Sequence, residues 1–558
     1  MRFSGQVWSF GPTEAAGSSP APEMRGNHHM TTRTALTRLG KLVAAELADG
    51  LPGDATQQAM ETVGGVPELA GDLIELLIKE GAKKRPNDGI ISAYSFLLGH
   101  ALEQLRYAVD RESPDALAFV GGLRAGLFEA AISARVTPPI LLLILHQYAS
   151  AKLEIGHELR QLMQSMMEAD TESRAQVKPG AWSDQLAEMV EQFDGDEFAI
   201  QAWLEETAAA LPENMRCDFV LATLAEPEPT LHEAVLGFLC SAWSDVRSKL
   251  AETLHQAAPH GIVSPVMLRR MLAIRNWLPA EQRSAFDQAV AACRESGVAC
   301  ADWPGVTQAR MFATGIDGSG AHSVFIVVPE GRNHTIASAL GKVGAGVRDA
   351  WVKRGVTDRE MRDIERRFST EAFLAPTTRD YAITMLRSFL AMNVAAGTMP
   401  PFGLLAVAEA AGLDSLAPET MPVERLVEIL TGEVGSQHLS STGIDSALAA
   451  SARWPKEHPT IESWFEDNAE VRALLGKRKP KADPKDLLLA GPLQEHRRRW
   501  AELLAWTALG IKSRSDGAAW QDLAVVAREI LGVRPLCEIP LMRSIATTTV
   551  AVHRAQRP

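Results

Sequence analysis

Ionisable side chains gather in the mainly apolar segment 308–354, and their types would suit acid–base chemistry. The predicted ligand or partner site contains one acid, two histidines and two arginines: Asp317, His322, Arg332, His334 and Arg348. A histidine beside a buried strand, with an acid at the neighbouring turn, could transfer protons. No order of nucleophile, base and orienting group is visible, however. Turn capping by Asp317 and surface salt bridges by the other residues would explain the same pattern.

Two Glu-x-x-His patterns could contribute to a metal site. Glu154 precedes His157 and Glu252 precedes His255, so on a helix each pair would lie on one face. Carboxylate four-helix bundles hold two metal ions with two such pairs and two further glutamates. A chain with 14 histidines and 69 acidic residues produces such pairs by chance. We therefore expect neither a metal site nor a cofactor.

A third group of residues could bind phosphates. Basic residues are frequent in the segment 477–499, and the arginine run 497–499 leads directly into Trp500. Arginines could contact nucleic-acid phosphates while the indole ring stacks on a base. Trp500 also shares one helical stripe with Leu503 and Leu504, which predicts that its side chain belongs to the core.

The segment that carries the first predicted site is expected to form a β-hairpin. Residues 317–320, with the sequence DGSG, form the predicted turn, because glycine supplies positive φ and aspartate can bond to the backbone. Residues 324–328 are apolar on both strand faces, so we expect that strand to be buried on both. The following sequence TIASAL, residues 335–340, is predicted to be helical, and GKVGAG, residues 341–346, to join two helices.

Helical periodicity dominates the rest of the chain. Leu69, Leu73, Leu76 and Leu77 form one apolar stripe, with charged residues opposite. Aromatic residues are only 6% of the sequence, which favours helices over sheets. The predicted fold class is therefore mainly α, with stacked antiparallel helix pairs, either solenoid-like or in a multi-helix bundle, and one small β-hairpin module.

Short helices alternate with tight breaks over residues 197–297, and paired helices recur about every 40 residues. The best local match is Asp245-Val246-Arg247, followed by Leu250 and Leu254. This stretch resembles HEAT or armadillo repeats. The resemblance implies an α-solenoid in which the aspartate and the arginine connect neighbouring repeats.

The composition shifts along the chain predict seven parts. They are a disordered N-terminal extension (1–29), an N-terminal helical region (30–170), HEAT-like repeats (180–300), a β-hairpin plus helix module (305–355), a helical region (356–475), a charged linker (476–485) and C-terminal helices (486–558).

Charge and cysteine usage restrict the function classes. The net charge is −13, whereas proteins that coat nucleic acids are usually basic. Five cysteines without a CxxC pair are typical of free thiols in a reducing compartment. The apolar run 139–145 is too short to span a membrane, and the first 30 residues lack the apolar run of a secretion signal. We expect a cytoplasmic protein without membrane insertion.

These observations favour a non-enzymatic scaffold or protein-interaction module, because stacked helices expose a broad docking surface. The expected partner is a protein rather than nucleic acid. One alternative is an enzyme whose site lies near the hairpin module, within residues 308–354. A further alternative is a nucleic-acid-associated protein that uses the basic segment 477–499.

Overall fold

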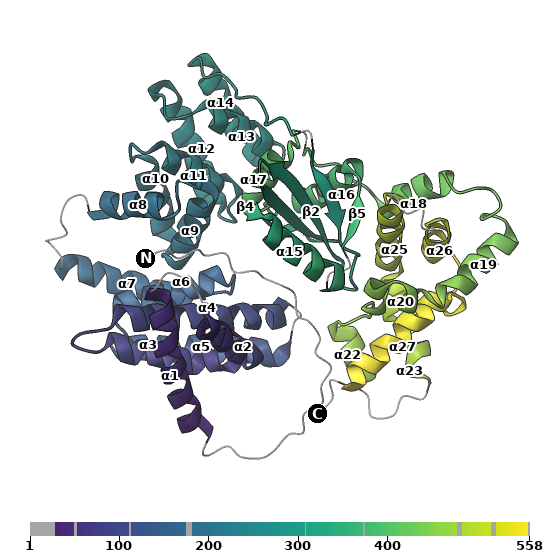
Figure 1. Cartoon of the computed structure of the whole chain (residues 1–558), viewed down its shortest axis with the longest axis horizontal. Helices are drawn as coiled ribbons and strands as arrows, with labels where there is room; N and C mark the ends of the chain where they lie inside the picture. Colours follow the sequence, from purple (N-terminus) through teal and green to yellow (C-terminus); the bar gives the residue numbers. More distant parts are fainter. Residues whose placement is uncertain are drawn as a thin grey trace. The chain divides into compact units, whose positions relative to one another are not determined.

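Helices form most of the chain in the computed structural model, and one small antiparallel sheet interrupts them (Figure 1). The predicted mainly α fold class with one β module is confirmed. The structure describes residues 28–48, 53–110, 113–173, 181–306, 308–371, 374–414, 416–476, 482–514 and 520–555. Most of the predicted extension 1–29 and half of the predicted linker 476–485 lie outside these residues.

The chain divides into two compact units. The first comprises residues 1–239 and 243–253, and the second comprises residues 240–242 and 254–558. The helices of the first unit are α1 (His28–Ala48), α2 (Asp54–Gly65), α3 (Ala70–Gly81), α4 (Asp88–Asp110), α5 (Pro114–Ile132), α6 (Pro138–Ser150), α7 (His157–Ser173), α8 (Ala181–Gln192), α9 (Glu197–Ala210), α10 (Glu213–Leu224), α11 (Pro229–Val235) and most of α12 (Ser244–Ala257).

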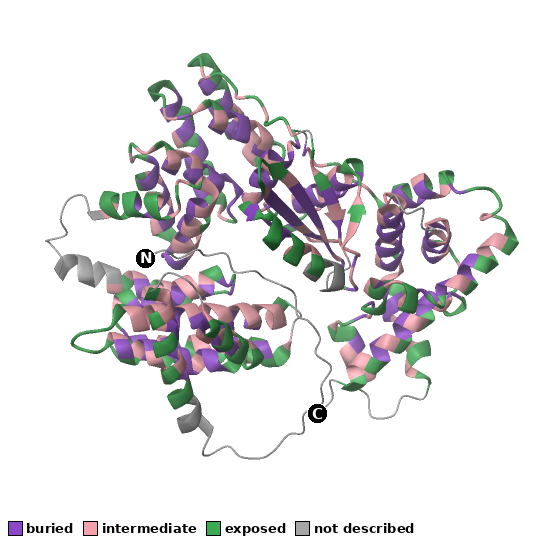
Figure 2. Ribbon diagram, viewed as in Figure 1, coloured by how far each residue is buried: buried purple, intermediate pink, exposed green. Residues whose placement is uncertain are grey.

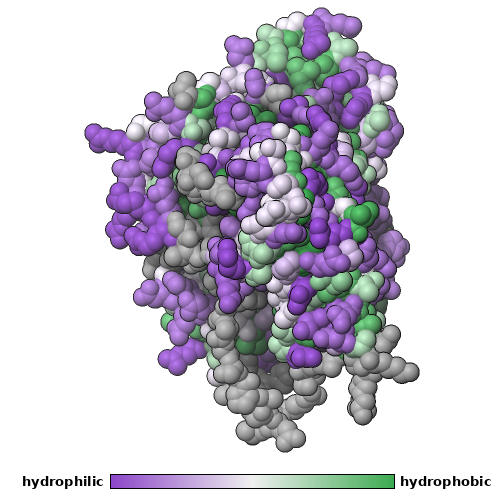
Figure 3. Space-filling model, turned by 90° about the vertical axis from the view of Figure 1, so that its right-hand side faces the viewer, coloured by the Kyte–Doolittle hydropathy of each residue, from purple (hydrophilic) through white to green (hydrophobic). Residues whose placement is uncertain are grey.

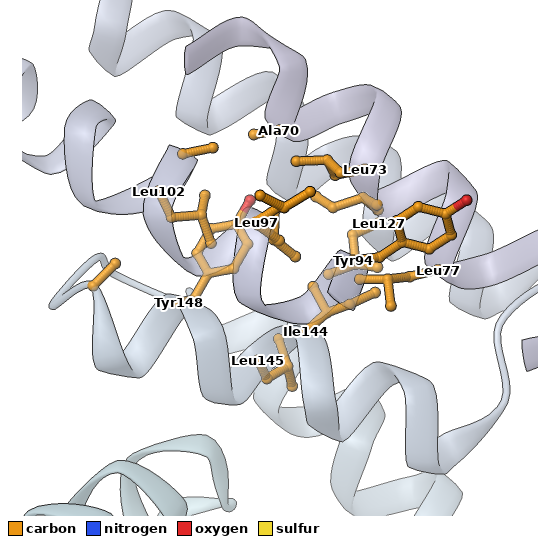
Figure 4. Close-up of a cluster of buried hydrophobic side chains, with 14 of the residues drawn as sticks. Ala70, Leu73, Leu77, Tyr94, Leu97, Leu102, Leu127, Ile144, Leu145 and Tyr148 are labelled. Atoms are coloured by element: carbon orange, nitrogen blue, oxygen red, sulfur yellow. The ribbon is translucent and has the colours of Figure 1, made fainter. Parts of the chain in front are cut away.

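Helix α4 is the centre of the N-terminal helices, and it packs against α1, α2, α3, α5 and α6. Its apolar stripe includes Leu97, which is fully buried together with Leu73 of α3 and Ile144 of α6 (Figure 4). Burial of each such side chain contributes about 1.5–3 kcal/mol to stability. The apolar periodicity of the sequence therefore positions these helices.

The second unit contains helices α13 (Pro265–Arg275) and α14 (Ala280–Glu295), followed by the sheet. The sheet has the strand order β4-β3-β2-β1-β5. Its strands are β1 (Arg310–Ala313), β2 (Ala321–Glu330), β3 (Asn333–Lys342), β4 (Gly346–Thr357) and β5 (Ala375–Thr377). Every strand pair is antiparallel.

The prediction of a helix over residues 335–340 was wrong, because TIASAL lies within β3. The GKVGAG sequence, residues 341–346, forms the turn between β3 and β4, where Gly344 and Gly346 have positive φ. Small residues are needed in this part of the sheet because helices lie directly on it. A Cβ atom at Gly341 would collide with the ring of Phe389. Alanine and serine carry no strong strand signal, so the close packing was not visible in the sequence.

Helices cover both faces of the sheet. On one face lie α16 (Arg379–Ala395) and α17 (Gly403–Ala411), and Gly403 packs closely against the carbonyl oxygen of Ala350. On the other face lies α15 (Asp358–Glu371), which buries Met361 beside Val327 (Figure 1). The central strands are accordingly buried on both faces, as predicted for residues 324–328 (Figure 2).

The C-terminal helices form the rest of the second unit. They are α18 (Val423–Gly432), α19 (Ser441–Ser451), α20 (Trp454–Glu457), α21 (Pro459–Glu462), α22 (Ala469–Leu475), α23 (Pro484–Ala490), α24 (Pro492–Glu495), α25 (Arg497–Lys512), α26 (Gln521–Leu531) and α27 (Pro540–Ala555). Helix α25 is central and packs against α18 and α26.

The surface is mainly polar. Figure 3 shows that hydrophilic side chains cover most of the face that it presents, and that apolar residues occur in small groups. Such scattering is normal for a protein surface. No helix in the described part of the chain combines the length and the apolar character that crossing a bilayer requires.

Candidate functional site

The five residues of the predicted site lie at two opposite ends of the sheet. His322 pairs with Gly341 at one end of the β2–β3 ladder, whereas His334 pairs with Pro329 near the other end. Pro329 is seven positions along the strand from His322, which corresponds to about 23 Å. The structure therefore does not combine the five side chains into one site.

Three of these residues have ordinary surface roles or positions. His334 Nε2 lies 2.8 Å from Asp358 Oδ1. This contact corresponds to the surface salt bridges that the sequence offered as an alternative explanation. Arg332 and Arg348 are exposed. Arg348 follows Val347, which pairs with Gly341, so it lies at the His322 end of the sheet but is exposed.

Asp317 caps the turn that precedes β2. Its Oδ1 atom accepts hydrogen bonds from Ser319 Oγ and from the Ala321 amide, both at 2.8 Å. Gly320 supplies the positive φ that closes the turn, at 85°. These are the bonds expected from the turn-capping interpretation of the sequence.

His322 is the buried member of the predicted set. Its side chain lies on the sheet face that α16 covers, and the residue is 2% exposed. Its Nε2 atom lies 2.7 Å from the hydroxyl oxygen of Tyr381, which is also buried. Burial lowers the pKa of His322 to about 4, and burial raises the pKa of Tyr381 well above its usual range. The pair is therefore neutral at pH 7.

A small polar cavity adjoins this pair. Its volume is about 30 Å³, which is room for one or two water molecules. The lining comes from the segment between β1 and β2, the start of β2, α16, the α20–α21 region and the end of α25 with the residues after it: Thr314, Gly315, Ile316, His322, Tyr381, His458, Thr460, Trp506, Thr507, Gly510, Ile511 and Arg514. His322 Nδ1 and Trp506 Nε1 have no hydrogen-bond partner of ordinary geometry among the described atoms. Water could satisfy such groups, but the volume is far below that of a substrate pocket.

The turn 317–320 docks onto the C-terminal helices beside this cavity. The Gly318 amide donates to Ser463 Oγ at 3.2 Å, and Trp464 Nε1 donates to the Ile316 carbonyl oxygen at 2.9 Å. Arg499 donates to the carbonyl oxygen of Gly318. A side chain at position 318 would collide with the Ser463 carbonyl oxygen, so glycine is required there. We refer to this contact between residues 316–318 and residues 463–464 as the turn joint.

The arginines at the start of α25 have partners within the protein, although Arg498 is exposed. Arg497 donates to the carbonyl oxygens of Ile530 and Arg534, at 2.8 and 3.0 Å, and Arg498 forms an ion pair with Glu424. Their guanidinium groups therefore already have protein partners. The basic residues at positions 477–479 and 481 lie outside the described part of the chain.

Trp500 belongs to the core, as its helical stripe predicted. The residue is fully buried, and its Nε1 atom donates to Glu466 Oε2 at 3.1 Å. Its ring also packs against that of Trp464. A buried indole cannot serve as a stacking platform for a base. Trp500 therefore cannot have the role that the nucleic-acid hypothesis gave it.

The first Glu-x-x-His pattern is not a helical motif. Glu154 lies in the link between α6 and α7, and His157 is the first residue of α7. Over residues 28–555, within the described ranges, no three His, Cys, Asp or Glu side chains are grouped closely enough to hold a metal ion.

Sequence reasoning missed a buried ionic cluster in the second unit. Arg269 and Arg270 of α13 both bind the carboxylate of Glu409 on α17, with nitrogen–oxygen distances of 2.7 to 2.8 Å. Burial alone would raise the pKa of Glu409, but the two guanidinium groups hold it below its usual value. The only sequence signal was a pair of adjacent arginines in an apolar helix.

A carboxyl cluster in the first unit was also missed. Glu206 of α9 accepts a hydrogen bond from Ser150 Oγ of α6 at 3.1 Å, and its Oε2 atom lies 3.6 Å from His146 Nε2. Burial raises the pKa of Glu206 to about 7, and burial also raises the pKa of the adjacent Glu205. This cluster joins α6 and α9.

Comparison with known proteins identifies relatives but no activity. Two family models match parts of this chain: the Y4lR second domain matches residues 212–297, and the Y4lR C-terminal helical domain matches residues 424–554. The chain is 27% identical over 460 residues to the "Uncharacterized protein y4lR" of Sinorhizobium fredii (strain NBRC 101917 / NGR234). That alignment covers 81% of this chain and 87% of the relative. No solved structure matches the chain. By these matches, the chain is similar to Y4lR in its second domain and in its C-terminal helices.

Proposed function

We propose that the protein is a non-enzymatic scaffold, a protein-interaction module that uses its helical surface. The observation that carries this proposal is that the side chains that could take part in catalysis or binding make structural contacts instead. His322 is a neutral buried group, Arg499 and Trp500 belong to the interior contacts of the C-terminal helices, and Asp317 caps a turn. These residues stabilise the architecture, which is the pattern expected of a scaffold.

Within this proposal, each unit presents its own part of the HEAT-like helices predicted over residues 180–300, because the boundary between the units lies within this range. Helices α9 to α14 are short and are separated by tight breaks, as in repeat proteins that bind partners along exposed helices. The five free cysteines support a location in the reducing cytoplasm. The expected partner is a protein.

The test is to isolate the full-length protein from its native host and to measure its complexes by native mass spectrometry. The proposal predicts a stoichiometric protein partner. It also predicts that His322→Gln and Tyr381→Phe, which remove the ionisable groups but keep the approximate volume, leave that complex intact.

The enzyme alternative predicts a different outcome of the same experiment. An enzyme with a site at the hairpin module would be recovered without a stoichiometric protein partner and with a bound small molecule. His322→Gln would then remove that molecule. This result would overturn the scaffold proposal.

A further inference from the structure

A solvent-open groove of about 680 Å³ lies on the N-terminal helices of the first unit. Its volume falls within the range of pockets that hold ligands. One wall is α1, and the opposite wall is formed by the end of α3, the loop that follows it and the start of α4. The lining residues are Thr37, Lys41, Ala44, Ala45, Ala48, Glu80, Lys83, Asn87, Gly89, Ile90 and Tyr94.

The base of the groove is well packed. Tyr94 of α4 is 3% exposed, and Gly40 of α1 allows this ring to approach the α1 backbone closely. Figure 4 shows the Tyr94 ring at the edge of the apolar cluster, with its hydroxyl group directed away from Leu97. The groove therefore rests on the core of the N-terminal helices rather than on a separate loop.

The charged residues of the groove lining are Lys41, Lys83 and Glu80, which gives a net charge of +1 in a protein whose net charge is −13. Lys41 is exposed and has no ion-pair partner among residues of the described ranges. Lys83 pairs with Glu80 at 2.5 Å, so Glu80 does not neutralise Lys41. Exposed Lys84 and Arg85 follow in the same loop, and the neighbouring acid, Asp88, compensates for only one of them.

The lining distinguishes between two kinds of anionic partner. Binding of single-stranded nucleic acid usually needs exposed aromatic rings on which bases stack, and the one aromatic ring in this lining, that of Tyr94, is buried. The net charge of −13 also opposes a long polyanion more strongly than a short segment. The methyl groups of Ala44, Ala45 and Ala48 would instead accept small apolar side chains.

We propose that this groove binds a short acidic peptide segment of a partner protein, with a carboxylate at Lys41 and its small apolar side chains against α1. This inference rests on the proposed scaffold function and names the chemistry of its partner. Because charge at the rim supplies much of the recognition, binding should weaken as the salt concentration rises.

The experiment measures fluorescence polarisation of labelled peptides with the full-length protein. The acidic probe is a 12-residue peptide of alternating Glu and Ala, and the probes for comparison are a Lys–Ala peptide and a 12-nucleotide single strand. We expect the acidic peptide to bind, and we expect Lys41→Glu to weaken its affinity about tenfold. Ala45→Trp, which fills the groove without changing charge, should weaken binding as strongly.

Lys456→Glu on α20 is the matched control, because Lys456 is also exposed and the charge change is identical. It should leave peptide affinity unchanged. Equal affinities for Lys41→Glu and Lys456→Glu would overturn the assignment. The assignment would also be wrong if the acidic peptide did not bind and the nucleic-acid strand bound in a way that Lys41→Glu abolished.

The two proposals fail in different ways. If the complex from the native host forms but the acidic peptide does not bind the groove, the peptide assignment is wrong and the scaffold function stands. If the acidic peptide binds with the expected variant effects but no protein partner is found in the host, the scaffold function is wrong and the groove remains a peptide site.

Discussion

The turn joint of the second unit and the groove of the first unit use polar residues in opposite ways. At the joint, Gly318 is hydrogen-bonded to both Ser463 and Arg499, and the adjacent cavity has room for little more than water. In the groove, Lys41 has no partner within the described ranges, and about 680 Å³ is open to solvent. Polar residues that bind one another within the fold, as at the joint, have a structural role. An exposed charged residue beside a groove, such as Lys41, that lacks an ion-pair partner among the described residues is instead available to a binding partner.

The largest expected effect concerns the buried ionic cluster, in which Arg269 and Arg270 bind the carboxylate of Glu409. Glu409→Gln would remove the buried carboxylate that Arg269 and Arg270 share, so we expect a loss of about 3–5 kcal/mol in the free energy of unfolding. Chemical denaturation measures this loss. Glu428→Gln, at an exposed pair with Arg425, is the control and should change stability by less than about 1 kcal/mol. Similar losses in both variants would mean that burial does not distinguish the two sites.

The second prediction uses the pH dependence of the His322–Tyr381 pair. Because the pKa of His322 is about 4 in the folded protein and about 6.5 in the unfolded chain, the unfolded chain binds more protons between these values. The contribution of His322 to the free energy of unfolding should therefore be fully present above pH 6.5. It should fall by about 3 kcal/mol as the pH decreases to 4.

The measurement is the unfolding free energy of wild type and of His322→Gln at pH 7 and at pH 4.5. The variant should lose less stability on acidification than wild type does. His260→Gln, at an exposed histidine, should behave as wild type. If wild type and His322→Gln show the same acid sensitivity, then His322 is not a buried neutral group.

A smaller effect is expected at the turn joint. Gly318→Ala would place a methyl group against the Ser463 carbonyl oxygen, so the joint must shift, at a cost of about 1–3 kcal/mol. Thermal unfolding measures this cost. Gly305→Ala, where a Cβ atom would meet nothing within 4 Å, provides the comparison and should be nearly neutral. An unchanged unfolding temperature for Gly318→Ala would show that the joint is loose.

The smallest effect on stability is expected in the groove. Lys41→Glu should change the unfolding free energy by less than about 0.5 kcal/mol, because the residue is exposed and unpaired within the described ranges. The same variant should reduce acidic-peptide binding. A large loss of stability would instead assign Lys41 to the architecture and would remove the contrast with the turn joint.

The sequence predicted those features that depend on local pattern. The helical stripe placed Trp500 in the core, and the glycines of the DGSG sequence placed a turn at residues 317–320, because both signals lie within a few neighbouring residues. The strand β3 was missed because Ala337 and Ala339 favour a helix by their local propensity, and the small side chains are explained by the helices that lie directly on the sheet.

The candidate sites were harder to predict because they depend on contacts between distant residues. Gly318 and Ser463 are 145 positions apart, and Arg270 and Glu409 are 139 positions apart. No local spacing indicates such pairs. His322 was recognised as unusual from its place beside an apolar strand, but its hydroxyl partner, Tyr381, lies 59 positions further along the chain, in α16, and gave no signal.

The turn joint also has a practical consequence for work with isolated fragments. The matched C-terminal helical domain covers residues 424–554, whereas the Trp464 indole donates its hydrogen bond to Ile316, far outside that range. A fragment cut at residue 424 would lose this acceptor and would expose the docking site of residues 316–318 on its surface. Such a fragment should be less soluble than the longer piece that begins before β1, so boundaries taken from the linear sequence are poor guides for its expression.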